Sequence, residues 1–464
     1  MTLSSVEISG ADTHGRRYLL VTLGCFKNEV ESDLLRSDLS ALGLSETRAV
    51  ESCDVVFVMT CGFIREACDE GIDSILELEE MVSRLTPRPP VLILGCMAQR
   101  YGAGLMSEMP EVSGALGRNW RAELAIALRE TLSGGRYEGA SQFPRLSDES
   151  RTVDSSENAT LYVRVADGCD RACRFCAIPS IRGPLVSRQP CDVLDEIRRL
   201  CSGREREVVL LAQDLTSYGR DLPTGSTDLA RIVADISGIE GVKWLRMLYL
   251  QPEGITDRLI EEVAGNPLVC DYFDIPFQHA SASVLRRMGR TGSGVEHLGL
   301  LARIRESIPD AAIRSTVMVG YPGETEREFE SLTSFVAEAR FDWLGAFVFS
   351  PEEGTTAASL RDRVPASVAL SRYDKVVEFQ DEIEANRIGS MVGMELEVVV
   401  DELCEIEPYD LTGRSYREAP VVDGMIYLKR ASRAGLTPEP GGFVTARITG
   451  NEGLDLVGEI QEAR

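Results

Sequence analysis

The sequence lacks any apolar run long enough to cross a lipid bilayer, which takes about 20 residues in a helix. It also lacks a recognisable signal peptide. We therefore expect a protein of the reducing cytoplasm, with no membrane partner. In such a compartment the 12 cysteines of the chain are expected to bind metal rather than to pair as disulfides.

Positive charge is also scarce, since 49 Lys and Arg residues stand against 74 Asp and Glu, for a net charge of −25. This balance disfavours broad nucleic-acid binding and favours a basic partner, although it also keeps a protein in solution. Histidine is scarcer still, with only His14, His279 and His297 among the 464 residues. A chain of this length is expected to hold about three domains.

Three cysteines, Cys169, Cys173 and Cys176, stand close together in the spacing C-x₃-C-x₂-C. The apolar run 161–165 before them predicts a buried strand, so the cysteines lie on the loop that leaves the strand. Such a loop can point three thiolates at one face of a cubane iron–sulfur cluster. Ordinary electron-transfer clusters take four cysteines, and no fourth stands nearby. One iron would therefore stay open to substrate or cofactor, much as a catalytic zinc site keeps an open position.

The alternative for this loop is a zinc site made of three cysteines and one histidine, because zinc sites share the C-x₂-C spacing. No histidine of the chain stands near the loop in the sequence. The iron–sulfur interpretation is therefore favoured.

The stretch 167–176, with the aromatic Phe175 before the last cysteine, resembles the signature of the radical S-adenosylmethionine enzymes. The resemblance implies that the open iron chelates S-adenosylmethionine, and that an electron from the 4Fe–4S cluster cleaves this cofactor to a 5′-deoxyadenosyl radical. Phe175 and Gln213, the latter just past the second strand of this domain, are candidate cofactor contacts. So are Gly320 and Gly323, in a turn that resembles the fifth unit of the family and permits close backbone approach. Alternatively, the turn only joins a strand to a helix.

Residues 16–131 alternate strands and helices, which indicates a parallel sheet. Apolar runs at 18–23, 54–59 and 91–94 are the predicted strands, and helical patterns follow at 28–42, 64–85 and 102–109. Cys25, Cys61 and Cys96 each stand at the carboxyl end of a strand, where open α/β sheets bind ligands. Taken singly, each is more typical of a buried core cysteine, but the shared position favours a common site.

The motifs around these cysteines, at 23–28, 60–64 and 95–100, resemble the amino-terminal domain of the methylthiotransferases. The resemblance implies that Cys25, Cys61 and Cys96 hold a second 4Fe–4S cluster, which also has an open iron.

The rest of the chain divides into a linker (132–158), a central domain (159–390) and a carboxy-terminal domain (391–464). Residues 178–184 contain too many helix and strand breakers for regular structure. Six strand–helix units predict a parallel sheet curled into a partial barrel of the radical S-adenosylmethionine type, because closure needs eight. Period-two strands between glycines then predict a small antiparallel barrel of about five strands, similar to an OB-fold. This barrel resembles the TRAM module of the methylthiotransferases.

TRAM modules usually bind RNA, which requires Lys and Arg against phosphate. Residues 393–464 hold 14 acidic and 7 basic residues, the wrong sign for RNA, so tRNA is an unexpected partner. The segments 413–415, 418–420 and 423–424 resemble the methylthiotransferase branch that modifies an aspartate of ribosomal protein S-twelve. The acidic rim of the carboxy-terminal barrel, including the segment 418–420, is expected to bind this basic ribosomal protein.

This branch implies transfer of a methylthio group to the β-carbon of the aspartate, with electrons from a donor such as flavodoxin or ferredoxin. Two alternatives stay open. The first is the branch that modifies adenosine in tRNA, and the second is a non-catalytic iron–sulfur carrier or redox-sensing protein.

Overall fold

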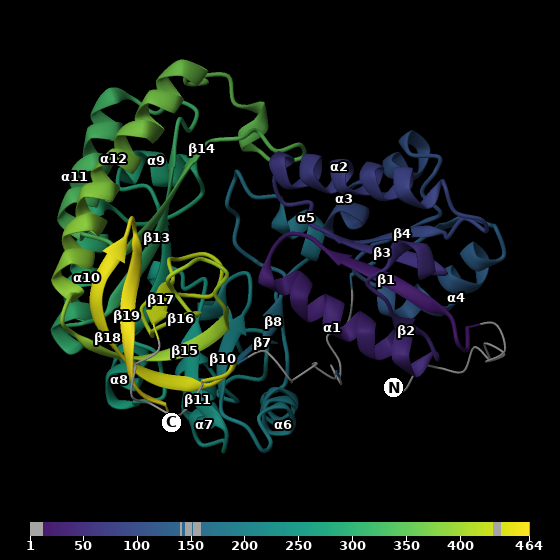
Figure 1. The fold of residues 1–464 in the computed structure, drawn as a ribbon. Coiled ribbons are helices and arrows are strands. Elements are labelled where there is room, and N and C mark those ends of the chain that lie inside the picture. The colour runs from purple at the N-terminus through teal and green to yellow at the C-terminus, as the bar shows by residue number, and fades with distance from the viewer. Residues whose placement is uncertain (1–12, 140–141, 144–150, 152–158, 430–437, 464) are drawn as a thin grey trace.

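The computed structural model describes residues 13–139, 142–143, 151, 159–429 and 438–463. Most of the predicted linker, 132–158, lies outside these residues. Figure 1 shows the amino-terminal domain on the right, and the central domain with the carboxy-terminal barrel on the left. No described helix is both long enough and apolar enough to span a membrane.

The amino-terminal domain is a six-stranded sheet of order β2-β1-β3-β4-β5-β6 in which every pair is parallel. Its strands are β1 (Arg17–Thr22), β2 (Ser45–Glu46), β3 (Val55–Thr60), β4 (Val91–Gly95), β5 (Gly114–Leu116) and β6 (Tyr137–Glu138). Its helices are α1 (Phe26–Ala41), α2 (Arg65–Val82), α3 (Cys96–Glu108) and α4 (Trp120–Leu132). The predicted parallel sheet is confirmed, and β6 adds a strand from the segment that we assigned to the linker.

The central domain contains six parallel strands in two three-stranded sheets, β11-β10-β7 and β12-β13-β14. The strands are β7 (Thr160–Arg164), β10 (Arg206–Leu211), β11 (Val242–Met247), β12 (Tyr272–Gln278), β13 (Ala312–Val319) and β14 (Trp343–Val348). An isolated parallel bridge pairs Leu245 of β11 with Val269, in the segment that leads into β12. This arrangement agrees with the predicted partial barrel of six strands.

Helices cover the outside of this partial barrel. They are α6 (Pro190–Leu200), α7 (Leu229–Ser237), α8 (Asp257–Gly265), α9 (Ala282–Arg287), α10 (Gly294–Ser307), α11 (Glu326–Ala339) and α12 (Ala366–Met391). Short helical turns lie at η1 (Val50–Ser52), η2 (Leu215–Ser217), η3 (Pro252–Gly254) and η4 (Ala357–Ser359), and a two-stranded ribbon is formed by β8 (Ala166–Asp167) and β9 (Val186–Ser187).

Two local predictions are wrong. Residues 178–184 are not irregular, because the short helix α5 (Ile178–Arg182) forms there with its proline in the first turn, where the missing N–H costs no helical hydrogen bond. The helix predicted to begin at Gly102 begins instead at Cys96. Gly95 adopts a φ of +97° and so turns the chain directly from strand into helix.

The carboxy-terminal domain is a closed barrel of order β15-β16-β17-β19-β18. Its strands are β15 (Glu395–Leu403), β16 (Leu411–Arg414), β17 (Ile426–Lys429), β18 (Phe443–Glu452) and β19 (Asp455–Ala463). The prediction of five strands is confirmed, but the purely antiparallel arrangement is wrong, because β17 and β19 pair in parallel. An apolar core of strand residues fills the barrel.

The barrel packs against the amino ends of the central strands through buried charges. Arg414 pairs with Glu207 at 2.9 Å, and Tyr272 donates to Asp423 at 2.6 Å. Glu418 is only 2% exposed and accepts a hydrogen bond from the Ser415 hydroxyl at 2.6 Å. The prediction that Glu418 lies on a docking rim is therefore wrong, because its side chain is buried where the barrel meets the central domain. The carboxyl ends of the strands stay clear of this joint.

Candidate functional site

The three-cysteine loop begins directly after β8 and is held by backbone contacts. Gly168 has a φ of +72°, and a Cβ added there would lie 1.9 Å from the carbonyl oxygen of Pro184, so only glycine fits. The Cys169 N–H donates to Gly183 at 3.0 Å, and the Arg174 N–H donates to Met288 at 2.9 Å. The loop thus lies between the α5 segment and the end of α9, with its three thiols partly exposed.

Side chains next to the loop supply packing and positive charge. Phe175 packs against an apolar cluster that includes Met288 and Tyr321. Arg290 reaches to 3.9 Å from the Cys173 sulfur, and its other nitrogen donates to Gln251 at 2.6 Å. The loop therefore has a fixed guanidinium beside one of its thiols.

The amino-terminal cysteines lie where three strand ends approach closely. Cys25 precedes α1, Cys61 follows β3, and Cys96 opens α3. A Cβ added to Gly24 would lie 2.6 Å from the Cβ of Cys61, and one added to Gly62 would lie 2.7 Å from the Met97 backbone. The glycines beside the cysteines thus let these loops touch, as the shared position at the strand ends predicts.

A buried ionic network runs from Cys96 to the start of the loop that carries Cys169. Arg182 of α5 donates to the Cys96 sulfur at 3.3 Å and to Asp167 at 2.9 Å. Asp167 directly precedes the three-cysteine loop and also pairs with Arg118. Arg118 in turn pairs with Glu31 of α1 at 2.8 Å. Each of these four charged side chains is nearly inaccessible to solvent. The network therefore joins the amino-terminal sheet to the loop of Cys169.

The thiols differ in their electrostatic surroundings. Burial raises the pKa of Cys176 to about 12 and that of Cys61 to about 11. Burial also acts to raise the pKa of Cys25, but the positive charges of Lys27 and Arg182 outweigh it and hold that pKa below the ordinary value. Positive charge near Cys25 thus favours the thiolate form of this residue.

The histidines leave the zinc alternative without its fourth ligand. His14 lies against Gly43, His279 accepts backbone hydrogen bonds from Ala280 and Ser281, and His297 packs on Phe277 at 4.5 Å between centroids. Among the described residues no three His, Cys, Asp or Glu side chains are close enough to hold a single metal ion. A cubane cluster is larger than an ion, so its thiolates stand further apart.

Of the predicted cofactor contacts, Gln213 shows the clearest fit. Both polar atoms of its amide are buried, and neither has a hydrogen-bond partner among the described residues. A buried polar group is normally hydrogen-bonded, so a ligand with polar groups suits this position beyond β10. Gly320 and Gly323 have φ of +74° and +76°, but a Cβ on Gly320 would meet Ala369 of α12 at 2.7 Å. Close packing against α12 is therefore enough to explain why glycine stands at position 320. Contact between Gly320 and the cofactor stays a prediction.

Comparison with known proteins separates the same three parts. Residues 17–117 match the "Uncharacterized protein family UPF0004", residues 163–336 the radical SAM superfamily, and residues 392–460 the TRAM domain. The proteins named "Ribosomal protein uS12 methylthiotransferase RimO" from Geobacter sulfurreducens and Symbiobacterium thermophilum are 40% and 37% identical. The first match covers 95% of this chain and 98% of the relative, and the second covers 99% and 94%.

The chain belongs to the RimO family of ribosomal protein uS12 methylthiotransferases. It is therefore a radical S-adenosylmethionine methylthiotransferase, and the predicted resemblance to the ribosomal-protein branch is confirmed. The superfamily implies S-adenosylmethionine and a 4Fe–4S cluster. Both the tRNA branch and the non-catalytic carrier lose their support. A tryptophan methyltransferase, TsrM of Kitasatospora setae, shares the fold alone, with a TM-score of 0.52 at 15% identity over 72% of this chain and 73% of that one.

The sequence patterns missed the charged residues of this site, namely Lys27, Asp167 and Arg182. Arg182 stands in the segment predicted to be irregular, and Asp167 opens the stretch 167–176 that resembles the radical S-adenosylmethionine signature. Lys27 and Asp167 each stand two residues from a cysteine. Charged residues are almost never fully buried unless they are paired, so the sequence held no direct signal that these would be buried.

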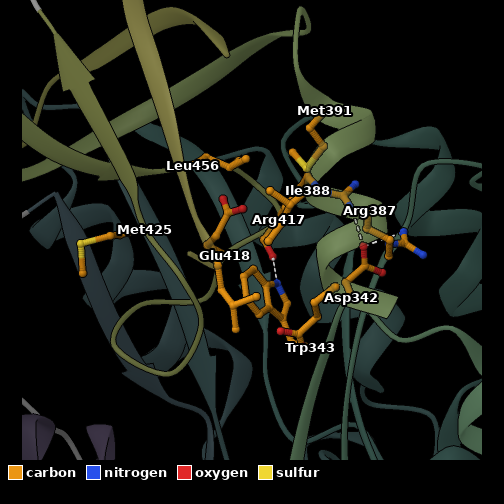
Figure 2. Close-up of a pocket in the computed structure, with 11 residues that line it drawn as sticks. Asp342, Trp343, Arg387, Ile388, Met391, Arg417, Glu418, Met425 and Leu456 are labelled. Atoms are coloured by element: carbon orange, nitrogen blue, oxygen red, sulfur yellow. Dashed lines mark hydrogen bonds and ion pairs between the residues drawn. The ribbon is translucent and has the colours of Figure 1, made fainter. Parts of the chain in front are cut away.

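A separate pocket lies at the joint of α12, β14 and the barrel (Figure 2). Figure 2 shows Asp342 between Arg387 and Arg417, and the Trp343 indole donates to the Arg417 carbonyl at 2.9 Å. Burial raises the pKa of Glu384 in this pocket to about 7. None of the cysteines lines it, so we regard it as part of the joint between the domains.

Proposed function

We propose that this chain transfers a methylthio group to the β-carbon of an aspartate in ribosomal protein S-twelve, using two 4Fe–4S clusters. One cluster is assigned to Cys169, Cys173 and Cys176, and the other to Cys25, Cys61 and Cys96. The observation that carries the proposal is the buried network through Arg182 and Asp167, which runs from the Cys96 sulfur to the residue before the loop of Cys169. A network that ties the amino-terminal site to this loop suits a reaction that needs both thiol sets.

S-adenosylmethionine bound at the first set would supply the radical that removes hydrogen from the unactivated carbon, and at the second set it would supply the methyl of the methylthio group. The residues of the chain would hold and orient these groups. Gln213 would donate and accept hydrogen bonds with S-adenosylmethionine, and Arg290 and Arg182 would offset the negative charge of the thiolates. An electron donor of the flavodoxin or ferredoxin type would fit this chemistry, as would the cytoplasm, since all 12 cysteines are unpaired.

Two triple variants test the assignment of the clusters. Changing Cys169, Cys173 and Cys176 to Ala should abolish cleavage of S-adenosylmethionine and remove about half of the iron of reconstituted protein. Changing Cys25, Cys61 and Cys96 to Ala should remove the other half, spare cleavage and stop methylthio transfer. Unchanged iron content in the second variant would show that its thiols are core residues.

The substrate is tested by mass spectrometry on two candidates given separately. A peptide from ribosomal protein S-twelve should gain a methylthio group on its aspartate, and tRNA should not. Modified tRNA with an unmodified peptide would overturn the proposed substrate. Formation of methionine and 5′-deoxyadenosine on reduction distinguishes an enzyme from a carrier.

The basic partner is proposed to meet the acidic tip formed by the end of β15 and the loop that leads to β16. Glu402, Glu405 and Glu407 are exposed there, and charges of one sign steer an oppositely charged partner. Reversing all three to Lys should slow association with the ribosomal protein, most clearly at low salt. Cleavage of S-adenosylmethionine without substrate should continue in this variant. Unchanged association across a salt series would mean that these acids are only a solvated face.

A further inference from the structure

Lys27 is a buried cation that lies beside the amino-terminal thiols. It stands two residues after Cys25 in the first turn of α1, and it is only 7% exposed. Its ammonium lies 3.9 Å from the centre of the Tyr249 ring, just beyond the carboxyl end of β11. The side chain therefore reaches from the amino-terminal domain toward the end of the partial barrel where the cysteine loop lies.

The arginines near Lys27 already have carboxylate partners. Arg182 pairs with Asp167 at 2.9 Å, and Arg118 pairs with Glu31 at 2.8 Å. Arg314, further into the barrel, pairs with Asp274 at 3.2 Å. Within the part of the chain that the structure describes, Lys27 has only the face of the Tyr249 ring and no ion pair with a carboxylate.

A buried ammonium without a carboxylate partner is costly, because it has lost water and gained no equal partner. A cation–π contact offsets part of this cost. The ammonium of Lys27 can therefore pair with a negative group that enters with the substrate.

We propose that Lys27 binds the side-chain carboxylate of the substrate aspartate and so selects aspartate over asparagine. This inference rests on the proposed function. The methylthio group is to pass from the amino-terminal site to the β-carbon of the aspartate, and the carboxylate is bonded directly to that carbon. When the β-carbon approaches Cys25, the carboxylate comes within reach of the ammonium two residues away. A charge-assisted hydrogen bond there would hold the β-carbon in place for hydrogen removal.

The test compares two labelled peptides of ribosomal protein S-twelve, one with the natural aspartate and one with asparagine in its place. Binding is measured by fluorescence anisotropy, without oxygen, with reconstituted full-length protein and S-adenosylmethionine. The native protein should bind the aspartate peptide about tenfold or more tightly, as expected for loss of one hydrogen bond to a charged group. Lys27→Gln should bind the two peptides equally, and Lys27→Arg should recover part of the preference.

Lys375→Gln is the matched control, because Lys375 also lies over an aromatic ring, that of Phe329 at 5.8 Å, but on the exposed face of α12. It should keep the native preference. Iron content and the electron paramagnetic resonance spectrum of the reduced clusters should be the same in all four proteins.

Three outcomes would overturn the inference. In the first, Lys27→Gln keeps the native preference for aspartate. In the second, the native protein itself shows no preference between the peptides. In the third, Lys27→Gln loses iron or changes the spectrum of the amino-terminal cluster, which would show that its charge serves the thiolates. Failure of the native protein to modify the aspartate peptide would instead contradict the proposed function.

Discussion

Glu207 is predicted to stabilise the joint between the central domain and the barrel in a strongly pH-dependent way. Its carboxylate is fully buried, 2.6 Å from Arg246 and 2.9 Å from Arg414 of the barrel. It also accepts a hydrogen bond from the Thr160 hydroxyl at 3.0 Å. Replacement by Gln keeps the shape of the side chain but leaves two buried guanidinium groups without this charge.

The magnitude follows from the pKa of the carboxyl group. Burial acts to raise this pKa, but the charges of Arg414 and Arg246 outweigh it and lower the pKa from 4.5 to about 2. Such a difference corresponds to ~3 kcal/mol of stability at neutral pH. Because the folded-state pKa is the lower one, this stability is complete above about pH 5 and is lost as the pH falls toward 2. Breaking a buried ion pair costs a similar amount, ~3–5 kcal/mol.

The assay is urea unfolding of the cluster-free protein, followed by tryptophan fluorescence. Two of the three tryptophans report on the joint, since Trp244 donates to Glu397 and Trp343 to the Arg417 carbonyl. Glu207→Gln should lower the stability of this transition by ~3 kcal/mol at pH 7 and by only ~1.4 kcal/mol at pH 3. Glu405→Gln, at an exposed position, should change it by less than ~0.5 kcal/mol. A loss below ~1 kcal/mol at pH 7, or an equal loss at both pH values, would refute the reasoning.

Two further predictions concern the cofactor sites. Gln213→Ala should weaken binding of S-adenosylmethionine about tenfold, because it removes a buried amide that has no hydrogen-bond partner among the described residues. Equilibrium dialysis measures this affinity, and an affinity equal to that of the native protein would show that Gln213 does not contact the cofactor. Arg182→Met should make the reduction potential of the amino-terminal cluster more negative, because it removes a hydrogen-bond donor to the Cys96 sulfur. A redox titration followed by electron paramagnetic resonance measures this potential, with Arg198→Met at an exposed position as the control. An unshifted potential in Arg182→Met would contradict the prediction.

Local patterns in the sequence predicted the strands, the order of the domains and the two sets of cysteines. The reason is that each of these features depends on residues that are close together in the sequence. Alternating apolar runs define parallel strands, and a thiol that directly follows such a run stands at the carboxyl edge of the sheet. Cys25, Cys61 and Cys96 could therefore be grouped without coordinates.

Tertiary structure alone decided which charges meet. Arg182 and Cys96 are 86 residues apart, and Arg414 and Glu207 belong to different domains, so no local period connects them. The segment around Glu418 carries the expected negative charge, yet the docking of the barrel buries it. The same holds for Lys27, whose solitary burial beside Tyr249 depends on the packing of the amino-terminal domain against the partial barrel. Burial and pairing are properties of the packed chain, because they depend on what each distant segment places opposite a charge.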